Sequence, residues 1–210
     1  MTFLKIGLLV AVVAAVAVLS GLMLGKPRGS QFDRAGLATR KAIVVEHQIA
    51  QIDGDYALIV GDSIVERARL GSVCGLPVVT AGVSGSTLEE LQSLFERIAK
   101  MRPPKLLVLA AGINSFRNPG TGDAAKWEAS FLASLETLDR VSAVVALIDS
   151  DDVDSDAVRN ANQIIRRHAE ERNYAVVPAI SAELTLDGVH PSAAGYAVWA
   201  ENLGQSCVAR

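Results

Sequence analysis

This sequence has few aromatic residues, few cysteines and no surplus of basic residues, and the last two shortages each exclude a class of protein. Aromatic side chains make up 5% of the 210 residues, there are 2 cysteines, and the formal net charge is −3. Nucleic-acid binders neutralise phosphates with a surplus of Lys and Arg, so we expect no nucleic-acid partner. Two cysteines are too few for a cysteine zinc cluster or a disulfide framework. Half of the residues are hydrophobic, which excludes a disordered chain.

A long run without charge lies near the N-terminus, from Ile6 to Gly25, between Lys5 and Lys26. As a helix it would be about 30 Å long, which matches the hydrocarbon core of a bilayer. We therefore expect residues 1–27 to hold a single-pass membrane anchor. A cleaved signal peptide is the main alternative, although its apolar region is usually shorter. A helix buried in a soluble domain is the third, but such a helix is rarely apolar on every face.

After this segment, residues 28–54 indicate a juxtamembrane linker with a helix over Arg40–Ile52, and residues 55–210 indicate one domain. Within the domain, short apolar runs alternate with helical stretches. The expected strands are Tyr56–Val60, Pro77–Thr80, Lys105–Ala110, Ser142–Ile148 and Ala175–Val177. This alternation implies right-handed crossovers and a sheet covered by helices on both faces. We predict an α/β fold, a flavodoxin-like three-layer α/β/α sandwich around a five-stranded parallel sheet.

Residues with catalytic potential follow four of these strands. Ser63 follows the first, Gly82 the second and Asn114 the third, while Asp187 and His190 follow the fifth. Chemistry in parallel sheets collects at the carboxyl ends of the strands, so we expect these residues to share one edge. A nucleophile, an Asp-x-x-His pair and amide donors are the groups that acyl transfer needs.

These residues also carry a resemblance to a known family. Four short blocks occur in the order typical of the SGNH hydrolases: Gly61-Asp62-Ser63, Gly82, Gly112-Ile113-Asn114 and Asp187–His190. From about Ala57 to Leu203 the chain resembles a GDSL-type esterase of that family. Two positions depart from the family pattern. Ser115 stands where an Asp often follows the asparagine, and Thr80 stands where the second block commonly opens with Asn.

The resemblance implies a role for each residue. Ser63 would be the nucleophile, His190 its base and Asp187 the partner of the imidazole. The oxyanion hole would consist of the Ser63 and Gly82 amides and the Asn114 side chain.

The histidines point to the same base without the family. There are three of them. His47 lies in the juxtamembrane segment, and His168 lies on a helix face that we expect to be exposed. His190 alone has a carboxylate three residues before it on a loop at a strand end. Asp187 can therefore hold Nδ1 of this imidazole and leave Nε2 to face Ser63.

Each of these residues also has a simpler structural interpretation. Ser63 could cap a helix, Gly82 and Asn114 could occupy turns, and Asp187-Gly188 is itself a turn signal. Their joint placement at strand ends favours a site. Ser84 is a weaker nucleophile candidate, because its G-x-S-x-G pattern ends in Ser86.

We expect a serine esterase that hydrolyses carboxylic esters through an acyl-enzyme and needs neither a metal nor an organic cofactor. The resemblance implies acetylated carbohydrates, lysophospholipids or other acyl esters as substrates. Two alternatives remain open. One is an O-acyltransferase that uses the same triad with a sugar hydroxyl as acceptor, and the other is a non-catalytic binding module of the same fold.

The sequence gives conflicting signs about the compartment. Basic residues after the apolar run outnumber those before it, which points to a cytoplasmic domain, although long domains are translocated largely regardless of charge. Anchored members of the resembled family usually face outward, and we expect an extracytoplasmic, periplasmic domain. Cys74 and Cys207 could form a disulfide, which would persist only in an oxidising compartment. They could equally be two unpaired, buried cysteines.

Overall fold

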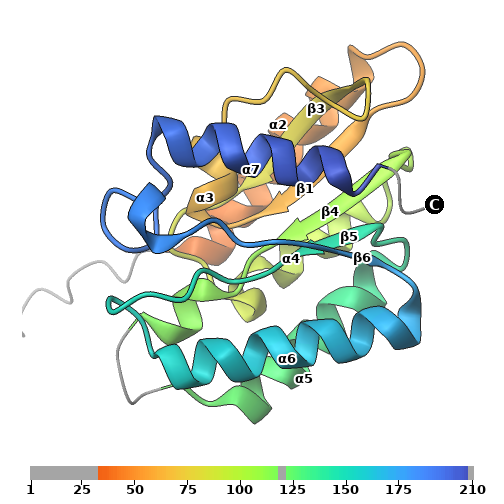
Figure 1. The fold of residues 1–210 in the computed structure, drawn as a ribbon. Coiled ribbons are helices and arrows are strands. Elements are labelled where there is room, and N and C mark those ends of the chain that lie inside the picture. The colour runs from red at the N-terminus through yellow and green to blue at the C-terminus, as the bar shows by residue number, and fades with distance from the viewer. Residues whose placement is uncertain (1–32, 118–121, 208–210) are drawn as a thin grey trace, which may run out of the picture. The chain divides into compact units, whose positions relative to one another are not determined.

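A six-stranded sheet with helices on both faces forms the centre of the computed structural model, which describes residues 33–117 and 122–207 (Figure 1). The strand order is β2-β3-β1-β4-β5-β6. The strands are β1 (Ala57–Gly61), β2 (Ser72–Val73), β3 (Leu76–Gly82), β4 (Leu106–Ala110), β5 (Ala143–Val145) and β6 (Ala175–Val177). The helices are α2 (Arg34–Ala50), α3 (Ser63–Arg67), α4 (Leu88–Ile98), α5 (Ala124–Leu138), α6 (Ser155–Arg172) and α7 (Ala193–Gln205). The α/β class predicted from the alternating pattern is confirmed.

The sheet is mixed, which corrects the expected five-stranded parallel sheet. Five strands pair in parallel, and the additional β2 pairs antiparallel with β3 through Ser72↔Pro77 and Val73↔Leu76. The turn between them contains Cys74 at φ 56 and Gly75 at φ 72. Two consecutive left-handed residues are typical of the tight turns that join short hairpins. A strand of two residues has no hydrophobic period, so the sequence contained no signal for it.

The two central strands are buried on both faces, as an uninterrupted apolar run predicts. Every residue of β1 and of β4 is buried. One face of the sheet packs against α2, α4, α5 and α6, and the other packs against α3 and α7. Figure 1 shows α7 and α6 on opposite sides of the sheet. The strands therefore carry the residues that follow them to one edge, between the two helical layers.

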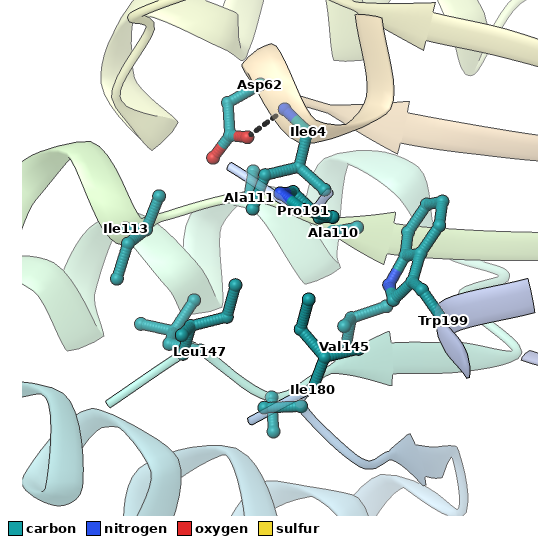
Figure 2. Close-up of a pocket in the computed structure, with 13 residues that line it drawn as sticks. Asp62, Ile64, Ala110, Ala111, Ile113, Val145, Leu147, Ile180, Pro191 and Trp199 are labelled. Atoms are coloured by element: carbon teal, nitrogen blue, oxygen red, sulfur yellow. Dashed lines mark hydrogen bonds between the residues drawn. The ribbon is translucent and has the colours of Figure 1, made fainter. Parts of the chain in front are cut away.

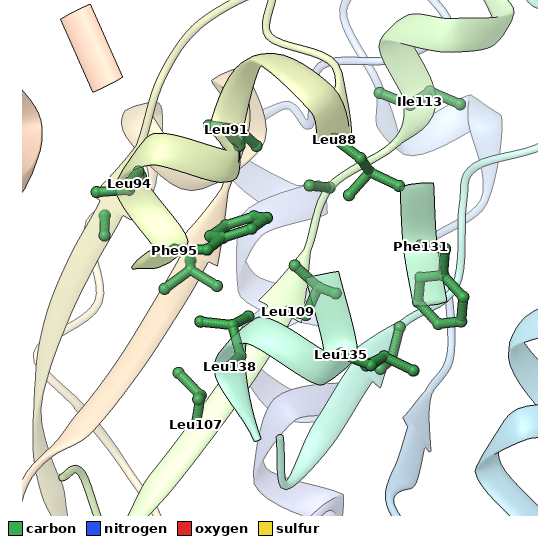
Figure 3. Packing of buried hydrophobic residues seen from close by; sticks show 14 of the residues in the cluster. Leu88, Leu91, Leu94, Phe95, Leu107, Leu109, Ile113, Phe131, Leu135 and Leu138 are labelled. Atoms are coloured by element: carbon green, nitrogen blue, oxygen red, sulfur yellow. The ribbon is translucent and has the colours of Figure 1, made fainter. Parts of the chain in front are cut away.

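The packing of α4 fixes one side of that edge. Leu88, Leu91 and Phe95 lie on one face of the helix and are fully buried against β4 and α5 (Figure 3). The helix begins with a capping box, in which Thr87 and Glu90 each accept a backbone N–H of the other. The loop from β3 to α4 thus has a defined end point.

The compact unit of the structure begins at Arg34 and includes α2 together with the expected 55–210 domain. Ala38, Ala42, Val45 and Ile49 recur at helical spacing and are buried in the same core as β1 and α4. No helix in the described ranges is long and apolar enough to cross a membrane. The expected anchor over residues 6–25 lies outside the described residues.

Cys74 and Cys207 form a disulfide, with their Cα atoms 5.5 Å apart. The bond joins the β2–β3 turn to the residues that follow α7. It closes a loop with a sequence separation of 133. On chain-entropy grounds a loop of this length stabilises the fold by roughly 5 kcal/mol, because it restricts the unfolded chain. Of the two interpretations of the cysteines, the structure contains the bonded one.

Candidate active site

Ser63 lies where β1 turns into α3, at the carboxyl edge of the sheet. It is 3% exposed and is the first residue of the helix. Asp62 is the N-cap, because its side chain accepts the Ile64 N–H at 3.1 Å. The capping role considered for Ser63 is therefore filled by its neighbour, and the Ser63 hydroxyl is directed elsewhere.

The Ser63 hydroxyl contacts His190, and His190 contacts Asp187. Ser63 Oγ lies 2.8 Å from His190 Nε2, and His190 Nδ1 lies 2.7 Å from Asp187 Oδ2. The other oxygen, Oδ1, accepts the backbone N–H groups of His190 at 2.8 Å and Val189 at 3.3 Å. The structure thus brings together the three residues predicted as nucleophile, base and partner, with each ring nitrogen facing the expected group.

Asp187 is arranged to stay ionised. Desolvation raises its pKa, but hydrogen bonds from the His190 backbone and ring, the nearby imidazole charge and the Val189 N–H outweigh burial, so the pKa falls to about 2. An ionised carboxylate on Nδ1 holds the imidazole in the tautomer whose Nε2 can accept a proton.

The loop that carries Asp187 and His190 is closed on itself. The Leu186 N–H donates to the His190 carbonyl at 2.7 Å, and Thr185 and Pro191 form a bridge. Gly188 adopts φ 74, and a Cβ there would lie 2.1 Å from an Asp152 carboxylate oxygen. The turn predicted at Asp187-Gly188 and the candidate pair of Asp187 and His190 therefore belong to one structure, because the turn places the carboxylate against the imidazole.

Asn114 lies in a short 3₁₀ turn after β4. Its side-chain Nδ2 donates to the Ser86 carbonyl at 2.9 Å, which ties the loops after β3 and β4 together. The preceding Gly112 adopts φ 123, and its carbonyl accepts the Trp127 indole N–H at 3.2 Å. One amide hydrogen of Asn114 is thus committed to the neighbouring loop, and the second has no hydrogen-bond partner among the residues that the structure describes.

Gly82 has a packing role in this structure. A Cβ on Gly82 would lie 2.2 Å from the Glu66 nitrogen, so only glycine lets α3 approach β3. The Val83 N–H donates to the Gly61 carbonyl. Because successive N–H groups of a strand alternate between its two edges, the Gly82 N–H is directed away from β1. This geometry does not favour the expected oxyanion role of Gly82.

A nearby glycine, Gly85, was not among the site residues predicted from the sequence. It lies at φ 72 in a turn that the Ser86 N–H closes onto the Val83 carbonyl, and the Ser86 carbonyl is the acceptor for Asn114. Within residues 33–117 and 122–207, the Gly85 N–H makes no hydrogen bond. The signal in the sequence was a glycine beyond the end of the strand, where the chain is free to turn.

Asp62 is a second carboxyl group at the site. In the sequence it was part of the Gly61-Asp62-Ser63 block and had no role of its own. It is 1% exposed. Burial raises its pKa to about 6, although backbone hydrogen bonds, including those from Ile64 and Gly112, and the Arg117 charge act in the opposite direction. Its position in the sequence, between an apolar strand and the candidate nucleophile, could have indicated a buried carboxyl group with a raised pKa.

A partly open cavity of about 30 Å³ lies beside Asp62 (Figure 2). Its wall is apolar except for Asp62. The lining residues are Asp62, Ile64, Ala110, Ala111, Ile113, Val145, Ala146, Leu147, Ile148, Ala179, Ile180, Pro191 and Trp199. In the described ranges, no group of three or more His, Cys, Asp and Glu side chains could hold a metal ion.

The other two histidines lie away from this edge. His47 is exposed on α2, and its Nδ1 contacts the Ile43 carbonyl. His168 was expected to be exposed, but it is 8% exposed, because it packs between α5 and α6 with both ring nitrogens on glutamates. Neither histidine reaches Ser63.

Comparison with solved structures finds proteins that share this fold. A Streptococcus pneumonia protein named for platelet activating factor is 18% identical over 93% of this chain and 99% of its own, with a TM-score of 0.70. A GDSL-like lipase from Bacteroides thetaiotaomicron is 16% identical over 81% and 98%, with a TM-score of 0.62. An acetylxylan esterase from Geobacillus stearothermophilus is 22% identical over 74% and 95%, with a TM-score of 0.57.

Comparison of the sequence with curated proteins finds no match. A family model does match, over residues 59–198, which include Ser63, Asn114, Asp187 and His190. That span is most of the compact unit and contains every block on which the resemblance rested. The chain belongs to the GDSL-like lipase/acylhydrolase family.

Proposed function

We propose that the protein is a serine esterase that cleaves carboxylic esters through an acyl-enzyme on Ser63. The observation that carries this proposal is the continuous contact from Ser63 Oγ to His190 Nε2, at 2.8 Å, and from His190 Nδ1 to Asp187, at 2.7 Å. A serine hydroxyl becomes an effective nucleophile when an adjacent base takes its proton, and this base is itself oriented by a carboxylate.

The reaction follows from this geometry in two halves. His190 Nε2 takes the proton of Ser63 as Oγ bonds to the ester carbonyl carbon. The tetrahedral oxyanion then collapses, the C–O bond to the alcohol breaks, and the imidazolium protonates the departing oxygen. In the second half, His190 takes a proton from water, the water oxygen attacks the acyl carbon, and Ser63 leaves with the proton returned to it.

The oxyanion is held by N–H groups on three loops. Ser63 is the first residue of α3, and the remaining side-chain hydrogen of Asn114 is a second donor. The Gly85 N–H replaces Gly82 as the third donor in this proposal, because the Ser86 carbonyl next to it already anchors Asn114. Loss of one such donor typically lowers turnover by about 10²–10³-fold.

Labelling and turnover test the proposal together. A fluorophosphonate probe should label Ser63, and the fragment that begins near Arg28 should hydrolyse simple p-nitrophenyl esters. Product analysis with and without sugar acceptors separates hydrolysis from acyl transfer. Full labelling of Ser63→Ala, with loss of labelling in Ser84→Ala, would reassign the nucleophile. Absence of both labelling and turnover would favour a non-catalytic module.

We also propose that residues 6–25 anchor the protein in a membrane and that the catalytic unit faces an oxidising, extracytoplasmic compartment. The uncharged run supports the anchor, and the Cys74–Cys207 disulfide supports the compartment. Alkaline phosphatase fused after Arg210 should then be active. An inactive fusion, together with two thiols that alkylate without reductant, would place the unit in the cytoplasm.

A further inference from the structure

We propose that Glu66 is a positioning residue for the reaction, because its carboxylate fixes the loop after β3, and with it the Gly85 N–H, relative to the helix that carries Ser63. This inference rests on the proposed esterase function and on Gly85 as a donor to the oxyanion. It adds a side chain that acts through the loop rather than on the substrate.

Glu66 lies on the same short helix as the nucleophile. Helix α3 begins at Ser63, and Glu66 follows three residues later. Residues at this spacing leave a helix on roughly the same face. The Glu66 backbone N–H donates to the Asp62 carbonyl at 3.0 Å, which closes the first turn of the helix. A group that is bound by the Glu66 side chain is therefore held in place relative to Ser63.

The group that Glu66 binds is the turn after β3. One carboxylate oxygen, Oε2, accepts the Ser84 backbone N–H at 3.0 Å and also accepts the Ser84 hydroxyl. Ser84 and Gly85 are the two central residues of the turn that the Ser86 N–H closes onto the Val83 carbonyl at 3.3 Å. Since the Gly85 N–H follows Ser84 directly, the contact with Glu66 determines where that N–H lies.

The two ends of the turn are held by other groups, but its centre depends on Glu66. The Val83 N–H donates to the Gly61 carbonyl at the start, and the Ser86 carbonyl accepts Asn114 Nδ2 at the end. Within residues 33–117 and 122–207, Ser84 has no hydrogen-bond partner other than Glu66. The glycine that follows adds little restraint of its own, because glycine adopts either sign of φ readily.

The second carboxylate oxygen contacts a different element. Lys41 Nζ, on α2, lies 3.4 Å from Glu66 Oε1. Partial burial raises the pKa of Glu66, but the Ser84 hydroxyl and N–H and the Lys41 charge outweigh it and lower the pKa overall. An ionised carboxylate carries no proton of its own, so Oε2 can accept both hydrogens of Ser84. The lysine and the turn use separate oxygens, and their contributions can therefore be tested separately.

Two substitutions of the same length isolate the contact with the turn. Glu66→Met has no acceptor for Ser84, whereas Glu66→Gln keeps an acceptor oxygen and loses the charge. With p-nitrophenyl acetate, Glu66→Met should lower kcat by about 10-fold or more and leave KM within about 2-fold, because a displaced oxyanion donor weakens transition-state binding rather than substrate binding. Glu66→Gln should restore kcat to within about 3-fold of the wild type.

The matched control is Lys41→Met. It removes the ion pair but leaves both contacts with Ser84, so its kcat should stay within about 2-fold of the wild type. A double-mutant cycle with Ser84→Ala then identifies the route. Ser84→Ala alone should lower kcat less than Glu66→Met does, because the backbone N–H still binds Glu66. In the double variant kcat should equal that of Glu66→Met, since the hydroxyl has already lost its acceptor.

The outcomes separate this proposal from the esterase function. Unchanged kcat in a Glu66→Met protein with a normal melting temperature would overturn the positioning role and leave the esterase intact. Equal losses in Glu66→Met and Glu66→Gln, or a higher KM without a lower kcat, would do the same. If Glu66→Met does not fold, Ser84→Ala decides, and unchanged kcat there overturns the proposal.

Failure of the esterase function has a different signature. If the wild-type protein cleaves no ester and the fluorophosphonate leaves Ser63 unlabelled, the esterase function itself fails, and the positioning role of Glu66 fails with it.

Discussion

Two regions of this molecule each combine a histidine with two acidic side chains, and they differ in the group that the second ring nitrogen faces. Between α5 and α6, His168 has Glu171 on Nδ1 at 2.7 Å and Glu128 on Nε2 at 2.9 Å. At the carboxyl edge, His190 has Asp187 on Nδ1 but the Ser63 hydroxyl on Nε2. The second acid there, Asp62, makes no hydrogen bond to the imidazole.

The difference explains what each histidine can do. An imidazole between two carboxylates has no nitrogen left to take a proton from a nucleophile, and it joins two helices. An imidazole with one carboxylate keeps its second nitrogen for chemistry. A catalytic histidine is thus distinguished by what its second nitrogen faces rather than by the number of acids near it.

Removing each imidazole in turn should give the largest difference in turnover between the two regions. His190→Ala and Ser63→Ala should each lower kcat by about 10⁴–10⁶-fold, because triad members act as a unit. His168→Ala should leave kcat within a few-fold of the wild type. Initial rates on p-nitrophenyl acetate measure both. Comparable losses in His168→Ala and His190→Ala, in folded proteins, would erase the distinction.

The next effect concerns the carboxylate on the active imidazole. Asp187→Asn should lower kcat by about 10⁴-fold, since an amide can hold the wrong tautomer of His190. The matched change, Glu171→Gln, alters the same ring position in the other region and should not affect turnover. Single-turnover rates with a short-chain ester compare the two. Equal rates for Asp187→Asn and the wild type would show that the carboxylate has no catalytic role.

A third effect appears in stability rather than rate. Burial raises the pKa of Asp62 from its ordinary value of 3.8 to about 6. The folded state therefore binds this proton more tightly than the unfolded state, and stability falls as pH rises from about 4 to about 6, by roughly 3 kcal/mol in all. Asp62→Asn should remove that slope. Urea unfolding at pH 4.5 and 7.5 measures how the free energy of unfolding changes with pH. The same change in the wild type and in Asp62→Asn would contradict the raised pKa of Asp62.

The smallest effect is the structural contribution of His168. His168→Gln should lower the free energy of unfolding by about 1–3 kcal/mol, because Glu128 and Glu171 lose a shared partner in a partly buried site. Urea unfolding at neutral pH gives the value. His47→Gln is the exposed control and should change stability by less than about 0.5 kcal/mol.

The sequence allowed correct prediction of the elements with strong local signals. The uninterrupted apolar runs predicted the central strands, and a count of three histidines left His190 as the one with a carboxylate on a strand-end loop. The α/β class and the family followed from the same residues. These features depend on short stretches of chain, so one sequence is enough to find them.

Features that depend on distant packing could not be predicted in the same way. The burial of His168 needs Glu128, forty residues away, to face it across two helices. The packing role of Gly82 depends on which edge of β3 its N–H faces and on how closely α3 approaches, and the free N–H of Gly85 depends on the turn that follows β3. The two residues of β2 form a strand only because the Cys74-Gly75 turn folds them back onto β3.

The disulfide divides the site topologically. The covalent ring that runs from Cys74 to Cys207 contains Gly85, Asn114, Asp187 and His190, while Ser63 lies on the tail outside it. A protease that cuts once inside the ring leaves one molecule, in which the two pieces separate on a denaturing gel only after reduction. A cut between residues 63 and 74 instead leaves Ser63 on a fragment that no disulfide joins to the rest, so the two pieces separate on a denaturing gel with or without reductant. Limited proteolysis therefore has two distinct consequences in this protein, and the boundary between them lies at Cys74.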